Sequence, residues 1–151
     1  MTTPDTAADT SKTVAFKTPV LAAVVALIGI ADSAYLTAKH FSGAAVPCSI
    51  VSGCETVLTS SYSEIYGIPT AAFGVFAYLI AFSLALLTAF GNTAMWKLFG
   101  AVVIVMTCFT VWLIYLQAFV IGAFCQFCLI SAATTLTLLI IFLASGFIRN
   151  K

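Results

Sequence analysis

The sequence predicts an all-α membrane protein, a four-transmembrane-helix bundle with a capping outer loop or short helix between helices 1 and 2. Composition is the first observation behind this fold class: the 151-residue chain is 62% hydrophobic and only 7% charged, and its mean hydropathy is +1.15, outside the range of soluble domains. The second is a series of apolar runs long enough to cross a hydrocarbon core, which takes about 20 helical residues. The net charge of +1 provides no basic surface for nucleic acid.

Two parts are expected along the chain. Residues 1–17 are rich in Thr, Ala, Asp and Lys, a composition typical of a disordered tail, which we place in the cytoplasm. Residues 18–151 form one membrane domain. Its first span is predicted over 19–41, opened by Pro19, because proline suits the first turn of a helix.

The other three spans are assigned to the remaining long apolar runs, which polar or charged residues separate. A second span starts near Pro69, after a polar stretch. No charged residue lies between Lys97 and Arg149, and as one helix this run would be roughly 75 Å long, so it must fold back once. Gly122 is the best candidate for that turn. The predicted spans are 19–41, 68–90, 98–120 and 124–147, with an outer loop at 42–67.

The distribution of Lys and Arg predicts the orientation. With four spans and both termini inside, five basic residues fall on the inner side and only Lys39 on the outer side, which satisfies the positive-inside rule for a cytoplasmic membrane. The alternative is a cleaved signal peptide in place of the first span. Cleavage would leave three spans with the basic ends on opposite sides. The inner set is Lys12, Lys17, Lys97, Arg149 and Lys151.

Four of the five cysteines form two close pairs on the predicted outer side, where disulfides persist. Cys125 and Cys128, called the helix pair below, stand three apart at the expected start of the fourth helix. Their sulfurs therefore share one face, and a helix N-terminus favours the thiolate. Such a pair can alternate between dithiol and disulfide. The alternative is that both are small buried packing residues.

Cys48 and Cys54, called the loop pair below, flank five residues of the outer loop. Such a loop can close a readily exchanged disulfide, accept electrons from a soluble thiol protein and pass them to the helix pair. A static structural disulfide is the alternative for this pair. A zinc or iron–sulfur site is a second alternative, although the spacing matches zinc patterns poorly and the chain has one histidine. Cys108, alone in the third span, is expected to be a packing residue.

Four segments, taken in order, resemble the vitamin K epoxide reductase family in its bacterial, quinone-reducing branch. The first helix contains the Tyr-Leu-Thr segment, within 29–37, and the outer loop contains the cysteine pair, followed by Ser60. Residues 67–74, Gly-Ile-Pro-Thr-Ala-Ala-Phe-Gly, resemble the start of the family's second helix. The helix pair, Cys-Gln-Phe-Cys at 125–128, completes the set.

This resemblance implies a function and a set of partners. A reduced thioredoxin-like (DsbA-like) protein would attack at Cys48, Cys54 would pass electrons to Cys125, and Cys128 would face a quinone, ubiquinone or menaquinone, dissolved in the membrane lipid. Because the sequence ends after the fourth span, we expect the partner to be a separate protein. Ser131 and Ala132 stand where vertebrate enzymes carry a tyrosine, which favours a plain quinone over vitamin K epoxide.

Further residues are candidates for quinone contact. Thr70 and Ser131 can donate hydrogen bonds to a carbonyl oxygen, or bond to their own helix backbone instead. Asp32 is an acid inside a span, expected either to relay a proton or to pair with Lys39, and the pairing is favoured. The alternatives for the whole chain are a DsbB-type enzyme, a metal-binding membrane protein and a structural membrane protein with inert cysteines. The predicted quinone-binding residues are Ser60, Thr70, Phe73, Phe124 and Ser131.

Overall fold

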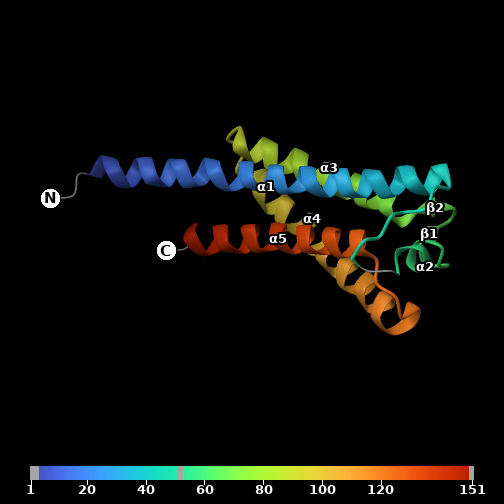
Figure 1. The fold of residues 1–151 in the computed structure, drawn as a ribbon. Coiled ribbons are helices and arrows are strands. Elements are labelled where there is room, and N and C mark those ends of the chain that lie inside the picture. The colour runs from blue at the N-terminus through green and yellow to red at the C-terminus, as the bar shows by residue number, and fades with distance from the viewer. Residues whose placement is uncertain (1–3, 51–52, 150–151) are drawn as a thin grey trace.

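A computed structural model describes the backbone of residues 4–50 and 53–149 and the side chains of residues 17–50 and 53–146. Its long helices run up and down (Figure 1), so that α1 begins and α5 ends at the same end of the bundle, the terminal end. The outer loop and the turn before α5 lie at the opposite end, the loop end. The long helices are α1 (Pro4–Ser42), α3 (Thr70–Ala89), α4 (Ala94–Tyr115) and α5 (Gln126–Arg149).

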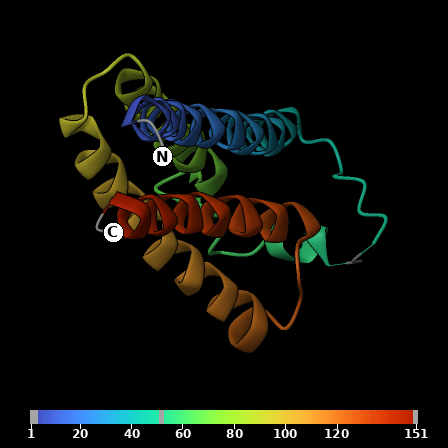
Figure 2. The same ribbon diagram turned by 90° about the vertical axis from the view of Figure 1, so that its left-hand side faces the viewer.

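The helices pack as a closed ring in the order α1, α3, α4, α5 (Figure 2). Four described segments are long and apolar enough to cross a membrane, which confirms the predicted four-span bundle, and each boundary lies within a few residues of its predicted position. Many large side chains on the outer surface are apolar and exposed, as expected for helices that face lipid. The segments are Lys17–Ser42, Thr70–Ala89, Ala94–Ile121 and Gln126–Gly146.

The start of α1 differs from the prediction. The helix begins at Pro4, so its backbone is helical through most of the segment 1–17 that was expected to be disordered, and Pro19 lies inside the helix. Proline is tolerated in the first turn of a helix, so Pro4 is compatible with a helix that begins there. Extending an existing helix also avoids the cost of nucleation. The cytoplasmic location of this segment stays a prediction.

The loop end contains a small folded cap. The predicted short helix is α2 (Cys54–Leu58), and a hairpin of β1 (Glu64–Ile65) and β2 (Ile68–Pro69), which was not predicted, leads into α3. Tyr66 and Gly67 both have positive φ, 54° and 78°, as a two-residue type I′ turn requires. Pro69 then occupies the N-cap of α3, close to its predicted role.

Small residues set the close approach of α1 and α3. Ala22, Ala23 and Ala26 of α1 are buried in the interior cluster together with Tyr78 of α3. A Cβ at Gly29 would overlap the Tyr78 ring, so this ring fits only because the residue is glycine. The packing therefore fixes the Tyr78 side chain across the middle of the bundle.

The turn before α5 is built as predicted. The last turns of the third span form a π-helix, η1 (Leu116–Ile121), and Gly122 follows it in the left-handed conformation with φ 67°, the geometry for which glycine is preferred. After three further residues, α5 begins at Gln126. This compact connection places the helix pair at the loop end of the bundle.

Candidate active site

The loop pair forms a disulfide, Cys48–Cys54, with Cα atoms 6.2 Å apart. Cys54 is the first residue of α2 and is 1% exposed, whereas Cys48 is only partly buried. A thiol arriving from outside the bundle therefore meets the Cys48 side of the disulfide, and Cys54 is turned toward the protein interior.

Two contacts hold the loop pair against the start of α5. The Ile50 N–H donates a hydrogen bond to Oε1 of Gln126 at 3.1 Å. Gly53 lies so close to the preceding turn that a Cβ there would stand 2.7 Å from the carbonyl oxygen of Phe124 and 3.0 Å from Cβ of Ala123. Glycine at position 53 is thus required for the loop to approach the helix pair.

The helix pair occupies the first turn of α5. The Cys125 carbonyl accepts the N–H of Leu129 at 3.0 Å, so Cys125 is the residue that caps the helix. The Cys125 N–H donates to Oε1 of Gln117 at 3.0 Å, and this buried glutamine of η1 fixes the position of Cys125. Cys125 and Cys128 are not disulfide-bonded, and Cys125 is 0% exposed.

Cys125 is set up to ionise. A hydrogen bond from the Cys128 thiol is the largest effect and lowers the pKa of Cys125 from 9.0 to about 7, and the backbone N–H groups of Cys128 and Phe127 act in the same direction. Burial and the nearby Asp32 oppose the shift. Because the thiolate is the reactive form in thiol–disulfide exchange, this lowered pKa increases the reactivity of the Cys125 thiol near neutral pH.

One buried cluster joins the two pairs. Cys54, Val57 and Cys125 form its fully buried part, and Cys48 and Cys128 pack against it with neighbouring apolar residues. The loop pair and the helix pair, more than 70 residues apart in sequence, therefore meet at the loop end of the bundle. Such an arrangement suits the exchange of a disulfide between them.

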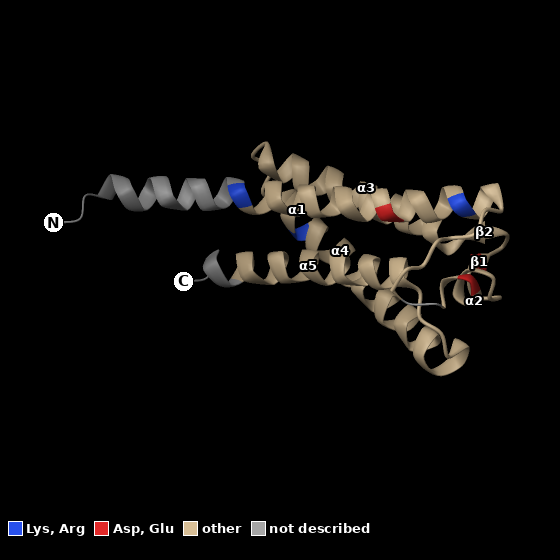
Figure 3. Cartoon of the chain, viewed as in Figure 1, with Lys and Arg blue, Asp and Glu red and all other residues tan. Residues whose placement is uncertain are grey.

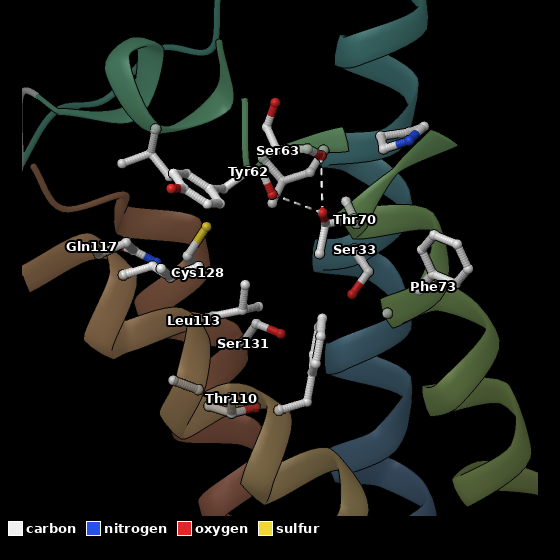
Figure 4. A pocket seen from close by; sticks show the side chains of 18 of the residues that line it. Ser33, Tyr62, Ser63, Thr70, Phe73, Thr110, Leu113, Gln117, Cys128 and Ser131 are labelled. Atoms are coloured by element: carbon white, nitrogen blue, oxygen red, sulfur yellow. Dashed lines mark hydrogen bonds between the residues drawn. The ribbon is translucent and has the colours of Figure 1, made fainter. Parts of the chain in front are cut away.

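An apolar cavity of about 370 Å³ lies directly below this cluster, enclosed by the four long helices and the cap. Of the four paired cysteines, Cys128 alone lines it, and Figure 4 shows Cys128 with Gln117 on the side of the cavity opposite Thr70 and Phe73. Its size lies in the range of small-molecule sites. The volume and the apolar walls fit a flat ring such as a quinone.

The sequence matches the model of the Vitamin K epoxide reductase family over residues 20–143. The protein belongs to this family. The match covers all four spans, both cysteine pairs and the cavity. The family's activity is that of a membrane thiol oxidoreductase coupled to quinone, and this member carries a disulfide-bonded loop pair within the matched residues.

Four of the five predicted quinone-binding residues line the cavity, and one does not. Ser60, Thr70, Phe73 and Ser131 line the cavity, whereas Phe124 does not and is 40% exposed. Phe124 precedes Cys125 in the connection to α5, where its backbone contacts Gly53 while its side chain lies on the surface. Its sequence position beside the helix pair was therefore a poor guide.

The hydroxyl of Thr70, predicted as a donor, and that of Ser60, predicted as a quinone-binding residue, are engaged within the protein. Thr70 donates to the carbonyl oxygens of Ser63 at 3.0 Å and Tyr62 at 3.3 Å (Figure 4). Ser60 lies just after α2, rather than at its start, and donates to the Val57 carbonyl at 2.7 Å. Both hydroxyls thus secure the cap, and their protons are engaged with backbone carbonyls.

Tyr78 was missed by the sequence reasoning. Its hydroxyl donates to the Ser131 carbonyl at 2.8 Å and bonds to the side-chain oxygens of Ser131 at 3.0 Å and Thr135 at 2.8 Å. All three residues line the cavity. The available signal was a lone tyrosine opposite a Ser/Thr-rich turn, with Gly29 leaving space for its ring, but a single sequence does not pair these positions.

The predicted ion pair between Asp32 and Lys39 is wrong. Lys39 Nζ lies over the Tyr35 ring, 5.7 Å from its centre, because the long side chain reaches toward the membrane interface. The ion pair found among the described side chains joins His40 and Glu64 at 3.1 Å. Asp32 instead lines the cavity.

Cys108 is exposed on α4, so its predicted role as a packing residue in the interior is wrong. An exposed position in a span faces lipid, where a small apolar thiol is tolerated. Within residues 17–50 and 53–146, no three His, Cys, Asp or Glu side chains come together as possible metal ligands.

Proposed function

We propose that this protein is a quinone-dependent thiol oxidoreductase that oxidises a separate, extracytoplasmic thioredoxin-like protein and so supports disulfide bond formation. The observation that carries the proposal is the single buried cluster in which the Cys48–Cys54 disulfide meets the unbridged helix pair at the mouth of an apolar cavity. The membership in the family supports the same reaction class.

The first half of the reaction takes place at the loop pair. A thiolate of the partner attacks Cys48, the more exposed sulfur, and Cys54 leaves as a thiolate. The second thiol of the partner then displaces Cys48, so the partner departs as a disulfide and the loop pair is left as a dithiol. Two electrons and two protons have entered the enzyme.

The second half passes these electrons inward. Cys54 attacks Cys125 of the oxidised helix pair, and Cys48 then attacks Cys54, which restores the loop disulfide and leaves Cys125 and Cys128 reduced. The pairing in the structure, a loop disulfide with an unbridged helix pair, corresponds to this stage. A quinone in the cavity accepts two electrons and two protons, and the Cys125–Cys128 disulfide forms again.

The proposed location is a cytoplasmic membrane, with both termini in the cytoplasm and the cysteines outside. Charged side chains are sparse and lie mainly near the helix ends (Figure 3). Lys17 starts the first span, whereas Lys39 lies in the last turn of α1 at the loop end. Lys97, in the first turn of α4, lies with Lys17 at the terminal end. This bias supports an inner terminal end.

The direct test is an assay with purified protein, a reduced thioredoxin-like donor and a quinone, read by the ultraviolet change of quinone to quinol. Oxidation of the donor should match quinol formation mole for mole. Failure of the wild-type protein to reduce any ubiquinone or menaquinone analogue would contradict the proposal.

A further inference from the structure

The Asp32 carboxyl is unusual among the buried groups of this protein. Asp32 lies on α1 inside the first span, Lys17–Ser42, ten residues before the end of the helix. Among the described side chains, its Oδ2 is the one buried nitrogen or oxygen atom without a hydrogen-bond partner. A buried carboxyl without a partner is costly, and a costly group inside a span indicates a function.

The two basic side chains of the same helix end and the Tyr78 hydroxyl make contacts elsewhere. Lys39, two turns along α1, lies over Tyr35, and His40 is paired with Glu64. The Tyr78 hydroxyl, which also lines the cavity, bonds to α5. The partly buried Asp32 side chain therefore lines the cavity with its Oδ2 atom unpartnered.

The cavity that Asp32 lines is also the one that Cys128 lines. Building on the proposed function, we propose that Asp32 is a catalytic residue that donates a proton to a carbonyl oxygen of the quinone as the helix pair delivers its electrons. The Asp32 O–H bond breaks and a quinol O–H bond forms. The thiol protons of the helix pair supply the second quinol proton and reprotonate Asp32, so the sum remains one dithiol plus one quinone giving one disulfide plus one quinol.

Other titratable groups on the cavity wall are less suited to this role. Tyr78 of α3 is held by α5, and Cys128 of α5 is an electron donor itself. His40 and Tyr62 lie at the cap, where His40 is paired with Glu64. The lining residues of α4 and η1 include no titratable side chain. Asp32 is thus the available acid below the cap.

The test compares Asp32→Asn with Asp32→Glu in the full-length, detergent-solubilised protein. Asn keeps the shape but has no acidic proton, so the single-turnover rate of quinol formation from the pre-reduced enzyme should fall about 100-fold, the scale of general acid catalysis. Asp32→Glu should recover much of this rate. The KM for quinone should change little, because the carboxyl acts on the transfer rather than on binding.

A readout independent of turnover identifies the proton itself. Infrared difference spectra between oxidised and reduced enzyme with bound quinone should contain a carboxyl band that Asp32→Asn removes and Asp32→Glu shifts. Ser33→Ala, the neighbouring cavity substitution, should leave that band in place.

Two results would overturn the inference. In one, Asp32→Asn reduces quinone at the wild-type rate. In the other, the variant loses quinone affinity with an unchanged limiting rate, which indicates a binding role. If the wild-type protein reduces no quinone, the proposed function itself has failed, so the two failures are distinguishable.

Discussion

The two cysteine pairs differ in what holds them. Cys48 and Cys54 are bridged across six residues in a segment whose one helix, α2, has five residues. Cys125 and Cys128 stand on the first turn of the 24-residue helix α5 and are fixed there by helix hydrogen bonds and by Gln117. Cys48 is therefore open to a thiol that arrives from outside the bundle, as the proposed function requires, whereas the helix pair has a fixed geometry beside the cavity.

The largest expected effects come from removing one pair at a time. Cys125→Ala or Cys128→Ala should abolish quinone reduction with every reductant, because both electrons leave through the helix pair. Cys48→Ala or Cys54→Ala should abolish turnover with a thioredoxin-like donor but retain turnover driven by dithiothreitol, which reaches the helix pair directly. Quinol formation with each reductant is the measurement. Identical behaviour of loop and helix variants with dithiothreitol would break the comparison.

A second prediction weakens the contact between the pairs without touching a sulfur. Gly53→Ala places a Cβ 2.7 Å from the Phe124 carbonyl, so the loop must move away. Turnover with a protein donor should slow by roughly tenfold or more, since a displacement of about 1 Å can cost up to about 100-fold in rate. Turnover with dithiothreitol should stay within about twofold of wild type, because the helix pair and the cavity are unchanged.

Gly146→Ala is the matched control for this substitution. It lies in α5 with nothing within 4 Å of a new Cβ, so both activities should be retained. Equal losses with the two reductants in Gly53→Ala would indicate a general structural defect instead of a broken relay.

A smaller effect concerns the ionisation of Cys125. Its pKa is lowered to about 7, chiefly by the hydrogen bond from Cys128. Below this pH the thiol is protonated and unreactive, so the alkylation rate of Cys125 in the reduced protein should rise as the pH increases through about 7. In Cys128→Ala the midpoint should move upward, because the main stabilising hydrogen bond is lost. Mass-spectrometric peptide mapping measures the modification, and an unchanged midpoint would contradict the assigned cause.

The sequence predicted those parts of the molecule that depend on local pattern. Apolar length located the four spans, Gly122 marked the turn, and cysteine spacing identified both pairs. The hairpin was missed because Tyr66 adopts positive φ, which residue type does not indicate. Asp32 was assigned to Lys39 on helix spacing alone, whereas Lys39 extends toward Tyr35.

The residues of the cavity wall could not be predicted from local pattern, because contacts between segments distant in sequence bring them together. Tyr78 meets Ser131 and Thr135 across more than 50 residues of sequence, and Gln117 reaches Cys125 from a π-helix. Neither pairing leaves a local pattern in one sequence. Phe124 shows the converse, since its position beside the helix pair suggested a cavity residue although its side chain lies on the surface.

The most direct test of the relay is to trap the bond between the pairs. In Cys128→Ala, the Cys125 thiolate can attack Cys54 of the loop disulfide, with Cys48 leaving as a thiol. No second helix thiol can then resolve the product, so a Cys54–Cys125 disulfide should accumulate. The two residues are 71 apart in sequence, and such a crosslink should shift mobility on a non-reducing gel and appear in peptide mapping. The bond requires Cα atoms within about 7 Å, as the shared cluster of Cys54 and Cys125 favours. Cys48→Ala should trap the same bond. The relay would be contradicted if peptide mapping found no Cys54–Cys125 bond in either variant. Cys128→Ala would then contain only the Cys48–Cys54 bond and a free Cys125, and the loop pair would be a structural disulfide.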